Sequence, residues 1–470
     1  MRRSIVWFRN DLRIHDNEAL FDAISQNDEI IPVYVFDERV FTSKTPFGFP
    51  KTSRFRTQFI IESVEDLRES LRSFNSDLLV RVGKPEEIIP QLARAFKTSY
   101  VYCNRERTQE ELDVQDALEN ELWHIGQEIR YFRGKMLYYT ADLPFPISHC
   151  PDSFSQFKKE LEKFIPVRKP LELTFDEIHS PNEDIEMGEI PSMNDFGLVS
   201  DNEDLSYLKG GEKAALDMLS EYVWDTDSIA NHQNNIKQLR AKECSSKLSA
   251  YLSQGCLSPK KLYYEIKSYE EWHDKSKSTN MFLTELMWRD FHRFMAKKHG
   301  NKIFKPAGIR DRESPVYNDK PELFEKWKSG KTGYPFIDAN MRELNATGFM
   351  SNIGRLCVAS FLVNELKLNW IQGAEYFESM LTDYDPCSNY GNWNIVAGVS
   401  LDTKDDFYIN IPNLAKRSDP KARFISNWIP ELKEANVDNL FNPFEDGESI
   451  LFQKYGYHPP CVYLKSWAEN

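Results

Sequence analysis

The chain has 470 residues, of which 41% are hydrophobic and 13% aromatic, enough for the large buried core of two or three domains. The formal net charge of −14 argues against a generic DNA binder, because such proteins rely on phosphate contacts and are basic at least locally. The seven cysteines are scattered without a Cys-x-x-Cys pair, which excludes a disulfide framework or a zinc site of ordinary spacing.

The amino terminus, residues 1–8, runs almost directly into an apolar stretch and has no signal-peptide cleavage site. No run approaches the eighteen or so apolar residues that a membrane span needs. We therefore expect a cytoplasmic protein that does not contact a membrane.

The first 130 residues alternate short β-branched runs with longer amphipathic runs. This alternation is typical of a parallel sheet with helices on both faces. The sequence predicts strands at 4–8, 30–36, 77–82, 99–102 and 128–132, and helices at 17–25, 53–74, 85–96 and 110–126. We expect an α/β parallel-sheet, Rossmann-like domain over residues 1–135. No Gly-x-Gly-x-x-Gly follows the first strand, so an ordinary dinucleotide site is not expected there.

Acidic residues interleaved with Pro, Asn and Ser dominate the stretch from about 170 to 208. This composition favours a long acidic linker along the surface, which we place at residues 136–209. Strand signals fade after it. The remaining helical patterns lie at 212–222, 257–267, 280–298, 322–329, 334–347, 354–365 and 373–381. We expect a larger all-α domain over residues 210–470.

Residues 381–393 combine two carboxylates, an amide and a tryptophan: Asp383, Asp385, Asn389 and Trp393. The carboxylates can accept hydrogen bonds from ribose hydroxyls or an N–H group. The amide can both donate and accept, so it can face a ring atom whose protonation changes with redox state. Trp393 can give up an electron at short range. A flavin pocket wall and an Asx-rich loop with one buried aromatic explain this segment equally well.

Two further motifs carry chemistry. Glu285 and Arg289 are four residues apart on a predicted helix, beside Trp288. Taken alone, a surface ion pair explains them better than a ligand site. The serines at 245, 246 and 249 precede a helical run, where hydroxyls and amides either hold phosphate oxygens or simply cap the helix.

Read in order, these segments resemble the cryptochrome/photolyase family, and most closely its DASH-type cryptochromes. The resemblance covers nearly the whole chain. The matching segments are 7–17, 47–52, 245–252, 255–259, 285–289, 331–335, 347–352, 383–393 and 411–416.

The resemblance implies an α/β antenna domain and a helical domain that holds a U-shaped FAD. It places Ser245, Ser246 and Ser249 at the FAD phosphates, and Glu285, Arg289, Asn352, Asp383 and Asp385 along the cavity. Arg355 matches an arginine that lies over the flavin and pairs with Asp383. Asn389 matches the residue facing flavin N5, where plant cryptochromes typically carry Asp and animal ones Cys. Because an amide cannot ionise, Asn389 supplies no proton.

The resemblance also implies an electron path. Trp393 and Trp370 match the inner two members of the family's tryptophan chain, whereas the outer position holds Tyr317. An oxidised tyrosine is strongly acidic, so its oxidation requires proton loss to solvent or a base. We expect photoreduction to survive but to be slower or to end differently.

For the antenna, the segment 105–111 resembles the DASH region that binds 5,10-methenyltetrahydrofolate. Glu111 is the best match to the pterin-binding carboxylate, and Glu110 is nearly as good. An acid-rich helix start explains both residues equally well.

The departures from the family cluster on the substrate side. Ile236, Ile353 and Tyr408 fall where repair enzymes carry phosphate-gripping arginines, and Ile395 replaces an aromatic residue. Leu356 replaces a polar or Met side chain, while Trp288 and Glu285 remain. Each lost phosphate contact weakens DNA binding, and a lost stacking ring costs about 1–3 kcal/mol. The (6-4) repair chemistry needs a histidine pair, yet residues 300–457 contain no histidine.

The sequence therefore predicts a DASH-type, FAD-binding, blue-light-responsive flavoprotein with weak or absent DNA repair and at most weak single-stranded DNA binding. We expect a monomer, and the sequence names no signalling partner. One alternative is a deoxyribodipyrimidine photo-lyase that acts on cyclobutane dimers in single-stranded DNA, with Glu285 hydrogen-bonding the lesion. Another is a binding module that keeps the fold without light function.

Overall fold

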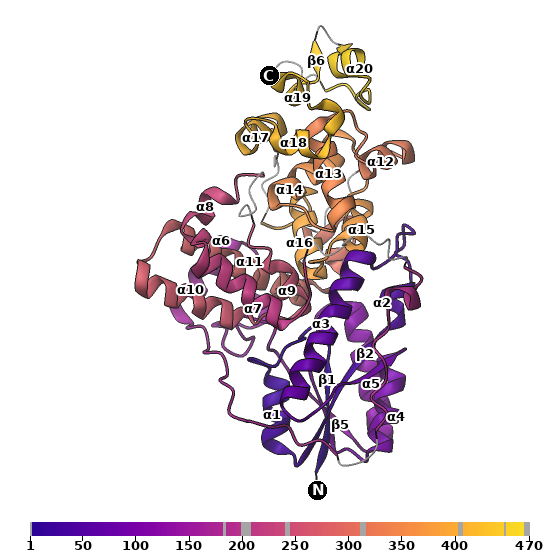
Figure 1. Cartoon of the computed structure of the whole chain (residues 1–470), viewed down its shortest axis with the longest axis vertical. Coiled ribbons are helices and arrows are strands. Elements are labelled where there is room, and N and C mark those ends of the chain that lie inside the picture. The colour runs from indigo at the N-terminus through magenta and orange to yellow at the C-terminus, as the bar shows by residue number, and fades with distance from the viewer. Residues whose placement is uncertain are drawn as a thin grey trace.

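The computed structural model describes residues 2–181, 185–198, 208–239, 245–310, 316–402, 408–445 and 448–464. An α/β domain surrounds the amino terminus, and helices fill the rest of the molecule up to the carboxyl terminus at the opposite end (Figure 1). This confirms the predicted fold class. Of the acidic residues in the predicted linker, Glu183, Asp184, Asp201, Glu203 and Asp204 lie outside the described residues.

A five-stranded parallel sheet forms the core of the α/β domain, in the order β3-β2-β1-β4-β5. The chain moves outward from β1 to β3 and then returns to β4 on the other side of β1. Ligands of such folds bind beside the carboxyl ends of the strands at this reversal. The strands are β1 (Arg3–Phe8), β2 (Glu29–Phe36), β3 (Leu79–Val82), β4 (Tyr100–Asn104) and β5 (Glu128–Phe132).

Both faces of the sheet are apolar and covered by helices, as expected for a parallel sheet. On β1, Ile5 and Trp7 pack with helices α4 and α5, while Val6 and Phe8 pack with α1 and α3. Figure 1 shows α1 on one side of the sheet and α4 and α5 on the other. The helices of this domain are α1 (Glu18–Gln26), α2 (Glu38–Thr42), α3 (Arg54–Ser73), α4 (Pro85–Ala95) and α5 (Gln109–His124).

Buried charges join the α/β domain to the helical domain. Lys260 lies 2.9 Å from Asp16, and both side chains are at most 2% exposed. Nη1 of Arg13 donates to the carbonyl of Gly255 over 2.7 Å. Gly255 has a φ of +68°, and a Cβ there would overlap the backbone of Asn10, so only glycine fits. Between the domains, the described chain carries the helix α6 (Phe154–Phe164) and a 3-10 turn at Met193–Phe196.

The helical domain contains all the residues that the family resemblance places along FAD. α7 and α14 continue into π-helical turns at Glu221–Asp225 and Phe361–Glu365, so the predicted helical runs span both parts. A small antiparallel pair, β6 (Phe444–Glu445) and β7 (Glu448–Ser449), departs from a purely helical domain. No helix within the described ranges is long and apolar enough to cross a membrane. The helices are α7 (Glu212–Ser220), α8 (His232–Asn235), α9 (Leu248–Gln254), α10 (Pro259–His273), α11 (Lys277–His299), α12 (Pro321–Lys328), α13 (Pro335–Thr347), α14 (Asn352–Ser360), α15 (Trp370–Met380), α16 (Pro386–Val396), α17 (Ile411–Ser418), α18 (Arg423–Trp428), α19 (Val437–Phe441) and α20 (Ile450–Tyr455).

Candidate functional site

The segment that links α15 to α16 holds the predicted carboxylates. It is a short turn followed by a helix: Pro386 occupies the first helical turn, and Oδ1 of Asp385 caps it by accepting from the Ser388 N–H over 2.9 Å. The sequence prediction missed α16 because its buried residues are spread around the helix instead of forming one stripe. The Asp-Pro pair is a helix-start signal that could have revealed it.

Asp383 brings together three predicted FAD residues from distant parts of the chain. Its Oδ2 accepts from the Ser249 hydroxyl over 2.7 Å and from Nη2 of Arg355 over 2.9 Å. Its Oδ1 is buried and has no hydrogen-bond partner among the described residues. Buried polar atoms are almost always paired, so this oxygen is free to accept from a donor outside the described protein atoms. A ribose hydroxyl or a ring N–H of FAD fits this requirement.

Asp385 faces cations instead. Nη2 of Arg293 donates to its Oδ2. Burial alone would raise the pKa of the Asp385 carboxyl, but Arg293, Arg289 and Lys135 hold that pKa well below its usual range. Asp385 is therefore an anion. Sequence reasoning missed Arg293, although it lies one turn beyond Arg289 on α11.

Arg289 clamps backbone segments together. Its guanidinium donates to the carbonyls of Lys135 and Leu252, over 2.6 and 3.1 Å. In the described part of the chain it forms no ion pair with Glu285, so the surface-pair explanation fails. Arg289 instead fixes α9, which carries Ser249, against α11.

Asn389 and Trp393 are buried on α16 against α15. Nδ2 of Asn389 donates to the Ala374 carbonyl over 3.0 Å, which fixes the amide plane. The Trp393 ring lies on Gly373 so closely that a Cβ at position 373 would overlap it. Trp370 is three residues before Gly373, and residues at this spacing share a helix face. Trp370 and the Trp393 ring therefore lie on the same side of α15, and Trp370 donates from Nε1 to the Pro306 carbonyl over 3.2 Å.

Tyr317 packs against the same core cluster as the tryptophans but makes no ring contact with the described residues. Its hydroxyl is buried and lacks a partner among these residues, and burial raises the pKa of the Tyr317 phenol. The aromatic ring in contact with Trp370 is that of Tyr390, at 6.2 Å between centroids.

The predicted phosphate-side residues differ in exposure. Ser245 and Ser246 are half-buried, and the Ser245 hydroxyl accepts from the Lys247 N–H over 3.1 Å. Asn352 is exposed at the first position of α14. A contact between these three side chains and FAD stays a prediction.

On the substrate side, Glu285 is exposed and its Oε1 lies 3.2 Å from Nε2 of His232. The buried His232 is in turn bonded through Nδ1 to the Tyr222 hydroxyl over 2.7 Å. Sequence reasoning missed this histidine, since no local pattern marks it. Trp288 stacks on Phe154 with a centroid distance of 3.8 Å, so one indole face is already covered.

That the substituted positions share one apolar surface on the substrate side stays a prediction. Ile236, Ile353, Leu356 and Ile395 are half-buried. Tyr408 is 54% exposed, and its hydroxyl donates to Glu365 over 3.1 Å.

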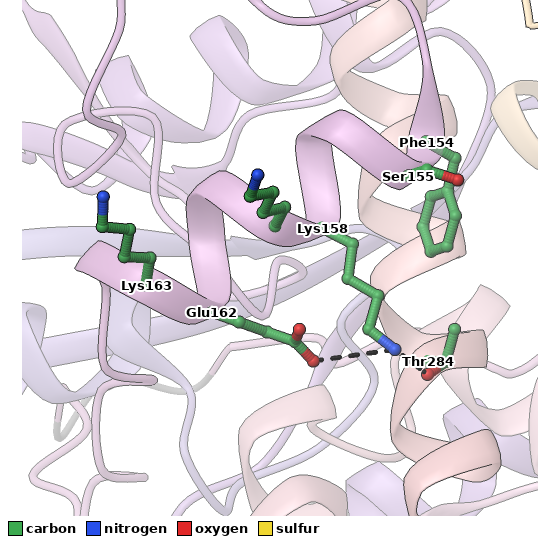
Figure 2. A pocket seen from close by; sticks show the side chains of 7 residues that line it. Phe154, Ser155, Lys158, Glu162, Lys163 and Thr284 are labelled. Atoms are coloured by element: carbon green, nitrogen blue, oxygen red, sulfur yellow. Dashed lines mark hydrogen bonds and ion pairs between the residues drawn. The ribbon is translucent and has the colours of Figure 1, made fainter.

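A separate shallow hollow of about 500 Å³ lies between α6 and α11 (Figure 2). Lys158, Lys159 and Lys163 line it, yet Lys158 already donates to the Thr284 hydroxyl over 2.8 Å and lies 3.6 Å from Glu162. None of the predicted FAD residues lines this hollow.

The predicted antenna carboxylate lies at the carboxyl edge of the sheet. Glu111, in the first turn of α5, pairs with Nη2 of Arg9, which directly follows β1. Nη1 of Arg9 also donates to Gln115 over 2.8 Å. Glu110 instead pairs with Lys51 and is exposed to solvent. Of the two candidates, Glu111 is thus the one beside the strand reversal.

Two family models match the chain: DNA photolyase over residues 4–174, and the FAD binding domain of DNA photolyase over residues 282–470. The chain is 42% identical to a Cryptochrome DASH from Synechocystis sp. over 471 residues, covering 99% of this chain and 96% of the relative. It is 40% identical to a Cryptochrome DASH of Xenopus laevis, covering 99% and 91%.

Two solved structures are also similar to this chain. A Synechocystis cryptochrome matches with a TM-score of 0.93 at 40% identity, covering 100% of this chain and 98% of that one. A bacterial class III photolyase from Agrobacterium tumefaciens matches with a TM-score of 0.86 at 25% identity, covering 100% and 96%.

Proposed function

Since the chain belongs to the cryptochrome/photolyase family and is a DASH cryptochrome that binds FAD, we propose that it is a blue-light photoreceptor whose flavin is photoreduced through Trp393 and Trp370. Bound FAD supplies blue-light absorption and electron-accepting chemistry. The protein's part is to hold the cofactor, to deliver electrons and to exclude water.

The single observation that supports cofactor binding most directly is the unpaired Oδ1 of Asp383. Ser249 and Arg355 fix the carboxylate through its other oxygen, so the free oxygen is held in place before any ligand arrives. We propose that it accepts a hydrogen bond from FAD. Asn389 lies one helical turn beyond Asp385 and stays neutral at all pH values, so it orients the cofactor without exchanging protons.

An absorption spectrum before and after blue light tests the proposal. We expect flavin bands in the purified protein and their bleaching under illumination with an external reductant. Trp393→Phe should keep the flavin and lose most of the bleaching. A purified protein without flavin absorbance would instead support a light-independent binding module.

We also propose that DNA repair is weak or absent. The apolar residues Ile236 and Ile353 offer no phosphate contacts, and Phe154 already occupies one face of Trp288. Glu285 favours the alternative, a cyclobutane-dimer lyase acting on single-stranded DNA, because it is exposed and held by His232. Light-dependent restoration of thymines in a dimer-containing oligonucleotide would establish the lyase.

The remaining predictions are a folate antenna at Glu111, weak single-stranded DNA binding, a monomeric state and a cytoplasmic location. The strand reversal beside Arg9 supports the folate site. A near-ultraviolet folate band that disappears in Glu111→Gln, with the flavin retained, would test it. Light scattering of the purified protein tests the monomer, and a fluorescent fusion tests the location.

A further inference from the structure

Trp370 touches a tyrosine that the sequence prediction did not consider. The Tyr390 ring lies 6.2 Å from the Trp370 ring at an interplanar angle of 74°. Tyr390 is 5% exposed and precedes Trp393 by one turn of α16. Its hydroxyl donates to Oε2 of Glu378 over 3.4 Å, a long hydrogen bond.

Tyrosine oxidation needs a proton acceptor, because the oxidised phenol is strongly acidic. Tyr390 has one in Glu378, a half-buried residue of α15. Tyr317 has a buried hydroxyl without a partner among the described residues. No acceptor among the described residues is therefore positioned at the Tyr317 hydroxyl to receive its proton.

Two opposing influences act on the Glu378 carboxyl, and the larger is burial, which raises its pKa and makes the carboxylate a better base. The Arg56 guanidinium donates to the Glu378 backbone carbonyl over 2.6 Å and favours a negative charge nearby. The charged and titratable groups around it are Arg56, Lys51, Glu110, Tyr384 and Tyr390.

We infer that Tyr390, with Glu378 as its proton acceptor, is the terminal electron donor to oxidised Trp370, in place of Tyr317. One electron passes from Tyr390 to the Trp370 radical cation, which returns to neutral tryptophan. The phenolic O–H bond breaks, and the proton forms an O–H bond on the Glu378 carboxylate. A neutral tyrosyl radical remains. The oxidant that first removes an electron from the tryptophans is the photoexcited flavin, so the inference rests on the proposed photoreduction.

Tyr384 offers a matched comparison. It also interacts with Glu378, but the Arg56 guanidinium lies over its ring at 4.8 Å. A cation over the ring opposes its oxidation, and in the described part of the chain Tyr384 makes no ring contact with Trp370.

The test compares Tyr390→Phe, Tyr317→Phe and Tyr384→Phe, each of which removes one hydroxyl and keeps the ring. After a blue flash, electron paramagnetic resonance of frozen samples with ring-deuterated tyrosine identifies a tyrosyl radical. We expect the radical in the wild type, Tyr317→Phe and Tyr384→Phe, and its loss in Tyr390→Phe. Loss in Tyr317→Phe or Tyr384→Phe with retention in Tyr390→Phe would overturn the inference, as would a flavin that bleaches without any tyrosyl radical.

Glu378→Gln tests the proton acceptor. The tyrosyl radical should form roughly a hundredfold more slowly, since a positioned base contributes at least that much. A readout without flavin uses 3-fluorotyrosine at position 390: its fluorine resonance should shift as Glu378 titrates, and this shift should vanish in Glu378→Gln. A radical that forms at the wild-type rate in Glu378→Gln would contradict the role of Glu378. Absence of flavin bleaching in the wild type would refute the proposed function itself, which separates the two failures.

Discussion

Nη2 of Arg355 donates to Oδ2 of Asp383 over 2.9 Å, which ties α14 to the turn before α16. The same oxygen accepts from Ser249 on α9. Three segments thus meet at one carboxylate, and Ser249 lies more than a hundred residues before the other two. The geometry leaves Oδ1 as a fixed acceptor, and it explains how the cavity wall keeps its shape before the cofactor binds.

Asp383→Asn should weaken FAD binding. The substitution loses the charge-assisted pair with Arg355, and a hydrogen bond to a charged group contributes about 1.5–3 kcal/mol. We expect the dissociation constant for FAD to rise by about tenfold to a hundredfold, measured by fluorescence quenching of added FAD. Asp116→Asn, at an exposed position of α5, is the control and should bind as the wild type does. Equal affinities for both variants would remove Asp383 from the site.

Gly373→Ala should destabilise the protein and disturb Trp393. Alanine normally favours a helix over glycine by about 1 kcal/mol, but here its Cβ would overlap the indole. Overpacking of this kind costs about 1–3 kcal/mol, which urea unfolding would detect. The double variant Gly373→Ala with Trp393→Phe should recover stability, because the smaller ring makes room. If the double variant is no more stable than Gly373→Ala alone, the contact is not the cause.

Glu343→Gln should abolish part of the pH dependence of stability. Burial raises the pKa of Glu343 to about 8, although Arg355 and Lys247 lower it. An unfolded glutamate titrates near pH 4.3. The stabilising contribution of the neutral acid is thus complete below about pH 4.3 and is lost as pH rises through 8, with a slope of at most about 1.4 kcal/mol per pH unit.

Urea unfolding of the flavin-free protein between pH 5 and 8 measures this slope. The free energy of unfolding should fall less steeply in Glu343→Gln than in the wild type, so the variant gains relative stability as pH rises. Glu121→Gln, on an exposed part of α5, should keep the wild-type slope. Parallel curves for wild type and Glu343→Gln would show that the carboxyl is ionised at neutral pH.

Ile353→Arg should restore a phosphate contact. Each contact with single-stranded DNA adds about 0.7 to the slope of log K against log salt concentration. We therefore expect tighter binding of an oligonucleotide at low salt and a steeper salt dependence, measured by fluorescence anisotropy. Ile353→Gln adds polarity without charge and should leave the slope unchanged. An unchanged slope in the arginine variant would place position 353 away from the nucleic acid.

Local sequence patterns predicted the strands of the sheet well, whereas only some of the side-chain contacts at the site were predicted. The strand at Glu128–Phe132 begins and ends where the sequence predicted, because its β-branched and aromatic residues are adjacent in the chain. The Arg355–Asp383 pair followed from the family resemblance, and its distance confirms it. Neither the local sequence patterns nor the family resemblance revealed the pairs Arg293–Asp385 and His232–Glu285. Both depend on which helices pack together, and no sequence spacing encodes that.

The Asp16–Lys260 pair bears on how this protein could be divided or recombined. If the helical half were exchanged for one without a cation at position 260, Asp16 would stay buried without this partner, and an unpaired buried charge costs several kcal/mol. A chimera that joins the α/β half to another helical half must therefore bring along an equivalent of Lys260.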